Sequence, residues 1–346
     1  MADTRSDSCL LNVNYLAYGF VLRSSRPIAA FHSLVPDASR FDVDIQIGEA
    51  PSWVTQALSL TAVPLETGRS RAPRAGQFSL AERGPGFFEL TYGDGTRFVV
   101  DREGARVWGQ PGPSLTYEDT LVYLLGPVMG FVLRRRNCLA LHASAVAFGK
   151  KAIAIAGPAG SGKSTTAAAL ALRGRPVLCE DICRIEENQI YPGYPRVCLW
   201  PDSVGFLYPS SDALPLIVEG WEKRYLPLDG TSGRFADTRL PLAGIYLLGA
   251  REERRSAVEI RPMTPREAAL ELVQNTYMNW LIDRDQRAAE FDAICKLVTA
   301  VGCFRVAPSA DPALLAELAE RIEAHALAGQ SCAQPGTRPE TAACDV

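Results

Sequence analysis

The N-terminal third of the chain has a pattern of hydrophobic and polar positions that is typical of β-strands. Apolar and β-branched residues alternate with polar ones in short runs such as 41–47 and 87–108, and Pro, Gly, Ser and Asp separate the runs. Gly93-Asp94-Gly95 and Glu103-Gly104 stand where the last of these runs would turn. Because alternation with period two between turn residues indicates hairpins, we predict a β-rich N-terminal domain over residues 1–115.

The pattern changes after Pro113. Residues 116–136 have the length and composition of a helix, and the three arginines that end it suit the negative end of a helix dipole. Two β-rich runs, 138–148 and 152–156, are joined by a Gly-Lys-Lys turn and predict a hairpin. The second run leads directly into a glycine-rich loop, after which residues 163–172 favour a helix.

The remainder of the chain alternates short strands with helices. Residues 176–179 and 242–248 read as buried strands. Thr264-Pro265-Arg266-Glu267 is a capping box that predicts a helix from there to about residue 281. Two further helices are expected at 287–301 and 311–327, and we predict an α/β domain over 116–328. The residues from 329 to 346 favour a disordered tail.

Composition narrows the classes of partner. The chain has 346 residues, 36 basic against 39 acidic side chains and a net charge of -3, so no broad cationic surface is expected to attract nucleic acid or an anionic membrane. The longest uncharged apolar run, 121–133, is shorter than the 20 or so residues of a spanning helix. Nine cysteines without a CxxC pair, after a polar N-terminus, predict a cytoplasmic protein with free thiols.

The strongest chemical signal is residues 157–164, Gly-Pro-Ala-Gly-Ser-Gly-Lys-Ser, which match the P-loop pattern GxxxxGK[ST]. In this pattern glycines let backbone N–H groups converge on phosphate oxygens, the lysine neutralises the β- and γ-phosphates, and the final hydroxyl binds Mg²⁺. The predicted strand before the loop and helix after it are the context that the motif requires. We therefore expect the nucleotide phosphates on Gly157, Pro158, Ala159, Gly160, Ser161, Gly162, Lys163, Ser164 and Thr165.

Kinases, ATPases, GTPases and ABC-type motors all use a P-loop. The sequence has no NKxD or LSGGQ-like signature, which argues against a GTPase and an ABC-type motor. His142 stands on the strand before the loop strand, and Asp181 ends the next strand, 18 residues after Lys163. Strand ends beside such a loop bind ligands, so both side chains can face the γ-phosphate. Asp181 then acts either as a Mg²⁺ ligand or as the base for an acceptor hydroxyl, and the nearby histidine favours the base.

Residues 141–183, LHASAVAFGKKAIAIAGPAGSGKSTTAAALALRGRPVLCEDIC, resemble the catalytic core of the HPr kinase/phosphorylase family. The resemblance implies that His142, Lys163 and Asp181 occupy the family's active-site positions and that Glu180 holds metal through water. It also implies an α/β P-loop kinase core of the kind related to phosphoenolpyruvate carboxykinase, followed by C-terminal helices.

Residues 221–229, WEKRYLPLD, are similar to the segment that carries the family's active-site arginine, which implies that role for Arg224. Lys223 and Arg224 together suit a clamp on transferring phosphoryl oxygens, and a solvated loop is the alternative. The glutamate-containing IRGxG segment of bifunctional members is missing, since the nearest stretch, VCLWPDS, offers only Asp202. A PVRPGRN-like loop is missing too, so the resemblance implies a kinase without the reverse reaction.

The N-terminal region combined with this core resembles the HPr-kinase-like proteins of lasso-peptide biosynthesis clusters. That resemblance implies an ATP- and Mg²⁺-dependent kinase that phosphorylates the C-terminal serine hydroxyl of a precursor peptide. Three alternatives stay open: an HPr-type protein serine kinase, a kinase of a small hydroxylated metabolite, and a nucleotide-gated peptide-binding protein that transfers nothing. A homo-oligomer is compatible with the sequence, which does not determine the oligomeric state.

Overall fold

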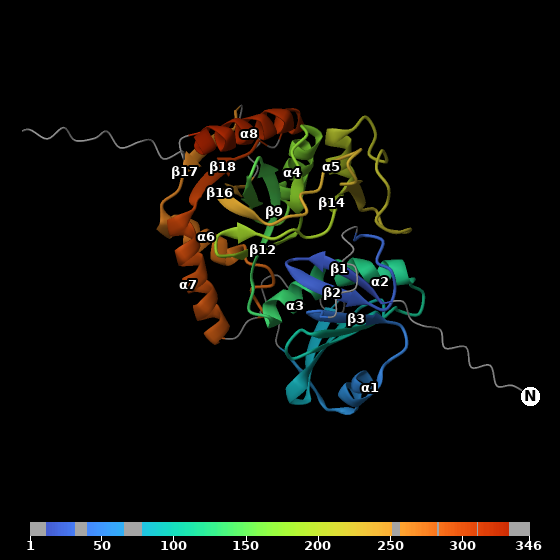
Figure 1. The fold of residues 1–346 in the computed structure, drawn as a ribbon. Coiled ribbons are helices and arrows are strands. Elements are labelled where there is room, and N and C mark those ends of the chain that lie inside the picture. The colour runs from blue at the N-terminus through green and yellow to red at the C-terminus, as the bar shows by residue number, and fades with distance from the viewer. Residues whose placement is uncertain are drawn as a thin grey trace, which may run out of the picture.

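The computed structural model describes residues 12–31, 40–65, 78–250, 257–281, 284–309 and 311–331. Over these residues the chain has a mixed α/β architecture with two large β-sheets, one in each half of the molecule (Figure 1). Most of the predicted tail, from residue 332 onward, lies outside the described residues. The described helices include none that is long and apolar enough to span a bilayer.

The first sheet confirms the β-rich reading of the N-terminal residues. Among the described residues it has eight strands in the order β1-β2-β3-β8-β7-β6-β5-β4, and β6, β7 and β8 form the predicted meander. Its strands are β1 (Val13–Ala17), β2 (Phe20–Ser24), β3 (Val43–Ile47), β4 (Ala62–Pro64), β5 (Phe78–Arg83), β6 (Phe87–Tyr92), β7 (Arg97–Asp101) and β8 (Arg106–Gln110). The domain boundary at residue 115 stays a prediction.

Helices cover both faces of this sheet. On one face α1 (Ser52–Ser59) packs against Val99 and Trp108. On the other, the predicted helix 116–136 is confirmed as a continuous helical run, with bounds α2 (Tyr117–Tyr123), the π-helical turn η2 (Leu124–Val128) and α3 (Met129–Arg135). The widened turn contains Pro127, which has no N–H to donate. This run lies between the two sheets (Figure 1).

The second sheet is mixed. The predicted hairpin forms, with β9 antiparallel to β10. Strands β10, β16 and β18 run parallel to one another. The strands are β9 (Leu139–Phe148), β10 (Lys151–Ala156), β11 (Val177–Cys179), β12 (Ile182–Glu186), β13 (Gln189–Ile190), β16 (Leu240–Leu248), β17 (Glu259–Pro262) and β18 (Gly302–Ala307). A separate two-stranded sheet pairs β14 (Arg196–Leu199) with β15 (Arg224–Pro227).

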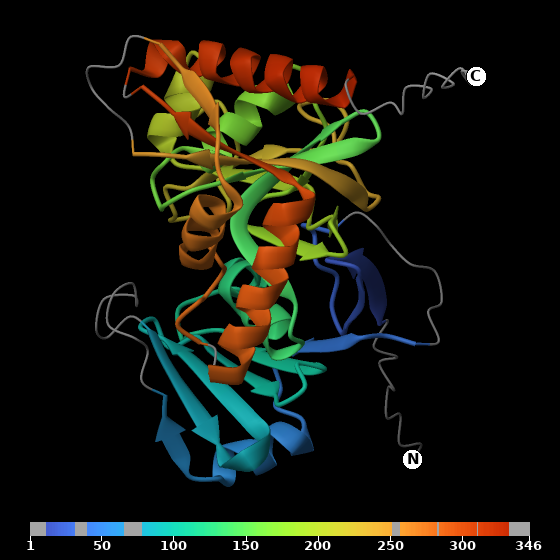
Figure 2. The same cartoon turned by 90° about the vertical axis from the view of Figure 1, so that its left-hand side faces the viewer.

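Alternating side chains divide the second sheet between two layers of helices. Ile153 and Ile155 of β10 face α4 (Lys163–Leu172) and α8 (Leu315–Ser331). The alanines between them, Ala152, Ala154 and Ala156, share a core with α6 (Pro265–Gln274) and α7 (Arg284–Ala300). Figure 2 shows α8 across one end of the molecule and α7 extending toward the first sheet. The remaining elements are α5 (Pro201–Leu207) and the 3₁₀ turns η1 (Gly84–Gly86) and η3 (Pro312–Leu314).

Two predicted helix ends are wrong. The capping box of Thr264 and Glu267 forms, but α6 ends at Gln274 and does not continue to residue 281. The chain leaves the helix there because its backbone pairs with β9, where the N–H of Tyr277 donates to the carbonyl of Ala140 over 2.7 Å. At the other end of the chain, α8 continues to residue 331, past the predicted start of the tail at 329.

A buried ion cluster braces the meander of the first sheet. Glu89 of β6, which is 7% exposed, lies 2.7 Å from a guanidinium nitrogen of Arg83 and 2.7 Å from one of Arg97. Burial by itself would raise the pKa of Glu89, but hydrogen bonds and charges from the two arginines outweigh burial and hold the pKa below its usual value. The carboxylate therefore stabilises the folded state as an ion.

We expect Glu89→Gln to lower the free energy of unfolding at neutral pH by about 1.5–3 kcal/mol, since both arginines lose a charged acceptor. Because the folded-state pKa is depressed, this contribution is complete above the unfolded pKa and is lost as the pH falls through the folded pKa. The difference between wild type and variant, measured by urea unfolding, should therefore shrink below about pH 4.

The matched control is Glu82→Gln. Glu82 pairs with Arg102, but their side chains are 32% and 43% exposed, so we expect a loss of at most about 1 kcal/mol. Equal losses in the two variants, or a Glu89 difference that persists at low pH, would contradict a buried ionic role for Glu89.

Candidate functional site

Residues 157–162 form a tight loop between the end of β10 and the start of α4. Gly157, Gly160 and Gly162 have φ values of 146°, 79° and 100°, which side chains rarely adopt. A Cβ at Gly157 would also lie 2.6 Å from the carbonyl oxygen of Leu248 on β16. The glycines thus let the loop turn close to the sheet and lead into the N-terminus of α4, an arrangement that favours an anion.

Lys163, the first residue of α4, lies over this loop. Its ammonium group donates to the carbonyl oxygens of Gly157 at 2.9 Å and Pro158 at 3.1 Å, and the residue is 6% exposed. A cation is therefore held within the loop itself, where its charge can act on a bound anion.

Two adjacent carboxyl groups follow β11. Glu180 is buried, and its Oε1 accepts a hydrogen bond of 2.6 Å from the hydroxyl of Ser164 on the first turn of α4. Burial, followed by the charge of Asp181, raises the pKa of Glu180. This contact joins the helix that starts at the loop to the carboxyl pair, so the predicted residues Ser164, Glu180 and Asp181 lie together.

Asp181 is held by two partners from different elements. Its Oδ1 lies 3.0 Å from Nδ1 of His142 on β9, and its Oδ2 accepts from the Tyr277 hydroxyl at 3.2 Å. Burial alone would raise the pKa of Asp181, but the hydrogen bond and charge of His142, the charge of Lys223 and the Tyr277 hydroxyl together lower it. The carboxylate is therefore ionised near neutral pH, and with 32% of its side chain exposed it remains reachable.

Tyr277 is a site residue that we did not predict. The helix expected to run to residue 281 would have placed it on a helix surface, whereas the real chain turns after Gln274 and brings it beside β9. Its ring packs against α3 at Gly130, where any Cβ would clash with the ring. A capping box marks the start of α6, but the sequence has no comparable signal for its end.

The glycine loop and the carboxyl pair line one cavity of about 220 Å³, and Tyr277 contacts Asp181 from outside its lining. The cavity contains the predicted His142, Lys163, Ser164, Glu180, Asp181 and Lys223, together with Trp200 and Ser203 from the start of α5. Burial lowers the pKa of Lys223, but electrostatic interactions with Glu180, Cys198 and Asp181 outweigh burial and raise it. Lys223 is therefore a protonated cation beside the carboxyl pair.

The structure does not bring Arg224 to this cavity. Its guanidinium donates to the carbonyl oxygens of Leu214 at 2.5 Å and Asp212 at 3.5 Å, and it does not line the cavity. Successive side chains of an extended chain point to opposite sides, so Lys223 faces the carboxyl pair and Arg224 faces away. Asp202, in the first turn of α5, is also absent from the lining.

A second cavity of about 230 Å³ adjoins the first. The two share Glu180, Asp181, Cys198 and Lys223. Away from these residues the second cavity is mainly apolar, and its other lining residues include Leu121, Val122, Leu125, Ile217, Val218, Trp221, Glu118 and Arg196. Asp181 and Lys223 thus stand where a polar cavity at the glycine loop meets an apolar cavity against the helical run α2–η2.

The donor set fits a metal that arrives with a nucleotide. Among the described residues, no group of three or more His, Cys, Asp or Glu side chains is arranged to hold a metal by itself. Mg²⁺, however, is usually bound by one or two carboxylates together with phosphates and waters. The Ser164 hydroxyl beside the Glu180 carboxyl provides oxygen donors of this kind next to the loop.

Comparisons with known proteins found similarity among solved structures alone. No protein-family model matches the chain, and no curated protein matches it. Among solved structures, the chain is similar to the Hpr(Ser) kinase/phosphatase from Coxiella burnetii, with 14% sequence identity and a TM-score of 0.27, over 54% of this chain and 97% of that one. Similarity at this level does not establish a family or a function for this chain.

Proposed function

We propose that the protein is an ATP- and Mg²⁺-dependent kinase with a P-loop core of the HPr kinase and phosphoenolpyruvate carboxykinase type, acting on a hydroxyl acceptor. One observation carries the proposal: an ionised carboxylate, Asp181, is held by His142 in the same cavity as a glycine loop and its lysine. A phosphate-binding loop next to a positioned base is what transfer of a phosphoryl group to a hydroxyl requires.

The nucleotide phosphates would lie on residues 157–165, with Lys163 neutralising their charge. Ser164 would hold Mg²⁺ directly, with Glu180 holding it through water and Asp181 close by. The chemistry that Mg²⁺ would supply there is neutralisation of the negative charge on the transferred phosphoryl group. The hydrogen bond between Ser164 and Glu180 supports this assignment, because it gathers hard oxygen donors at the first turn of α4.

Asp181 would take the proton from the acceptor hydroxyl. His142 contacts one oxygen of this carboxylate and Tyr277 contacts the other, so the two residues orient it. The lowered pKa of Asp181 keeps the carboxylate deprotonated at neutral pH, as a base must be. Lys223, in the position we assigned to a phosphoryl clamp, would stabilise charge on the transferred group. Most of the rate enhancement would then come from positioning and electrostatics.

The apolar cavity beside Asp181 is the place for the acceptor. We propose that it receives the C-terminal serine of a precursor peptide, with the serine hydroxyl at Asp181 and its carboxylate at Arg196. Arg196 lines the cavity and stacks on the Tyr225 ring at 4.2 Å, and a guanidinium is well suited to a carboxylate. The apolar residues of α2 and the 217–221 segment would take the preceding side chains.

The base assignment is tested by Asp181→Asn. We expect phosphate transfer to a serine-ended peptide, followed by mass spectrometry, to fall about 10²- to 10⁴-fold while ATP binding is retained, because the amide cannot accept the hydroxyl proton. Asp202→Asn, outside the cavity, serves as the control and should keep activity. If Asp181→Asn binds ATP and transfers phosphate at the wild-type rate, the mechanism is wrong.

Two neighbouring cations provide a second test. Since Lys223 lines the cavity and Arg224 is bound to loop carbonyls, Lys223→Met should reduce the transfer rate at least about tenfold more than Arg224→Met. Single-turnover transfer with saturating ATP measures the difference. A larger loss in the arginine variant, with both proteins folded by circular dichroism, would restore the clamp role to Arg224.

The acceptor site is tested with two forms of one peptide. Arg196→Gln should raise KM at least about tenfold for a peptide with a free C-terminal serine, and should change KM little for the same peptide with a C-terminal amide. Equal effects on both forms would exclude carboxylate recognition by Arg196. Phosphorylation of HPr or of a small hydroxylated metabolite in place of the peptide would favour those acceptors, and transfer to none would favour a nucleotide-gated binding protein.

A further inference from the structure

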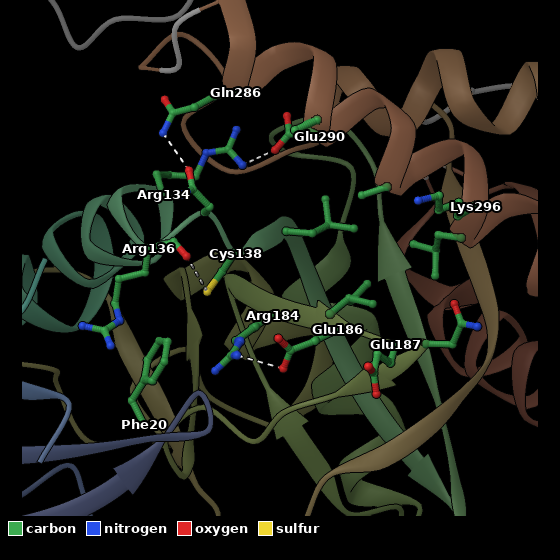
Figure 3. Close-up of a pocket in the computed structure, with 17 residues that line it drawn as sticks. Phe20, Arg134, Arg136, Cys138, Arg184, Glu186, Glu187, Gln286, Glu290 and Lys296 are labelled. Carbon is green, nitrogen blue, oxygen red and sulfur yellow. Dashed lines mark hydrogen bonds and ion pairs between the residues drawn. The ribbon is translucent and has the colours of Figure 1, made fainter. Parts of the chain in front are cut away.

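A large cavity lies apart from the proposed active site. It has a volume of about 630 Å³ and shares no lining residue with the two cavities that meet at Asp181. Its walls come from the end of α3, the start of β9, the turn between β12 and β13, and α7, with Phe20 of β2 at one side (Figure 3). It therefore lies where the helical run of the first sheet meets the second sheet.

Two buried arginines line this cavity. Arg134 at the end of α3 is 5% exposed and Arg184 of β12 is 7% exposed. Each is paired with one carboxylate: Arg134 with Glu290 of α7, and Arg184 with Glu186 at 3.0 Å. Figure 3 shows these two ion pairs on different walls, with Cys138 between them. The ion pairs fix the guanidinium groups, but they do not use all of their donors.

Three of the guanidinium nitrogens have no hydrogen-bond partner among the described residues. They are Nε and Nη2 of Arg134 and Nε of Arg184, and all three are inaccessible in the surrounding packing. An unsatisfied buried donor costs about 1–3 kcal/mol, and more when the group is charged. A buried donor without a partner needs an explanation, and a binding site supplies one. There, a small shift of neighbouring side chains would let an acceptor on a ligand reach the donor.

The charge of the lining limits what can bind. Four cationic side chains and three carboxylates line the cavity, and Arg136 is also paired with Asp42, outside the lining, at 3.9 Å, so the charges around the cavity balance. The cations are Arg134, Arg136, Arg184 and Lys296, and the acids are Glu186, Glu187 and Glu290. Much of the remaining wall is apolar and is formed by Phe20, Leu139, Ile185, Ala293 and Leu297. Together with the unsatisfied guanidinium donors, this lining favours a molecule that combines one small anionic acceptor group with an apolar body.

We propose that this cavity is a binding site for a small organic carboxylate with an apolar group. A carboxylate is planar and accepts two parallel hydrogen bonds from a guanidinium, which matches the unused Nε and Nη2 of Arg134. A carboxylate adds one negative charge to these balanced surroundings, whereas a phosphate dianion would add two beside Glu186 and Glu290. The apolar group packs against Phe20 and the side chains of β9, β12 and α7.

Binding at this site requires neither nucleotide nor acceptor, so it can be tested without any assumption about catalysis. The probe is benzoate, titrated calorimetrically into the full chain in the absence of ATP. We expect saturable binding at one site with a Kd of about 1 mM or tighter, and no saturable binding of the uncharged analogue benzyl alcohol. Tighter binding of phenyl phosphate than of benzoate would overturn the carboxylate assignment.

Variants locate the binding site. Ala293→Phe fills the cavity from α7 while keeping both arginines, and should weaken benzoate binding at least tenfold. Ala288 is an exposed residue of α7 outside the lining. Ala288→Phe is therefore the matched control and should leave the Kd for benzoate unchanged. A third variant, Arg134→Met with Glu290→Met, removes the buried ion pair as a unit without stranding either charge, and should also weaken binding at least tenfold.

Thermal unfolding shows that each variant is folded before the titrations are compared. Absence of saturable benzoate binding to the wild type would overturn the proposal. So would an unchanged Kd in folded Ala293→Phe, because binding would then lie elsewhere. Failure of the kinase proposal would leave these results untouched, since none of them measures phosphate transfer.

Discussion

The backbone pairing of strand β9 controls the positions of the groups in the candidate site. Along one edge β9 pairs with β10, which delivers the glycine loop, and along the other with β11 and β12, which flank Glu180 and Asp181. Where β10 ends, residues 275–277 continue the first edge, since the N–H of His142 donates to the carbonyl of Asn275 at 2.7 Å. One strand thus sets the register of the loop, the carboxyl pair, His142 and Tyr277.

The electrostatics of the site follow from this register. Glu180 and Asp181 are consecutive residues, yet burial raises the pKa of the first while His142, Lys223 and Tyr277 lower that of the second. Asp181 has a positive φ of 67°, a conformation that lets its side chain leave the course of the strands and meet its partners. The surroundings thus shift the pKa values of two like groups in opposite directions, which is how neighbouring carboxyl groups can take different tasks.

The sequence predicts the local structure of this molecule better than its long-range contacts. Strand alternation, the hairpin turn at 149–150 and the capping box of α6 are short-range signals, and each forms as expected. The loop, His142 and the carboxyl pair were also predictable, because they lie within 40 residues of one another on paired strands. Tyr277 was not, since a hydrogen bond to β9 from almost 140 residues away ends its helix.

Arg224 and Lys223 illustrate the same limit from the opposite side. The sequence motif places both residues near the site. Which of the two side chains lines the cavity depends on the direction in which each leaves the backbone, and the pairing of β15 with β14 sets that direction. The 630 Å³ cavity with Arg134 and Arg184 was equally hidden from the sequence, because α3, β12 and α7 assemble it. The arginines that end α3 looked like partners of a helix dipole, and one of them proves to be buried in an ion pair.

Gly130 has a consequence for how such a molecule can change over evolutionary time. It belongs to α3, whose side chains form the core of the first sheet, yet its bare backbone accommodates the ring of Tyr277, whose hydroxyl reaches Asp181. The helix that packs on the first sheet therefore supports a residue that orients Asp181. Exchanging that half for an unrelated one would remove the surface on which Tyr277 rests, so the two halves are not interchangeable modules and must diverge together.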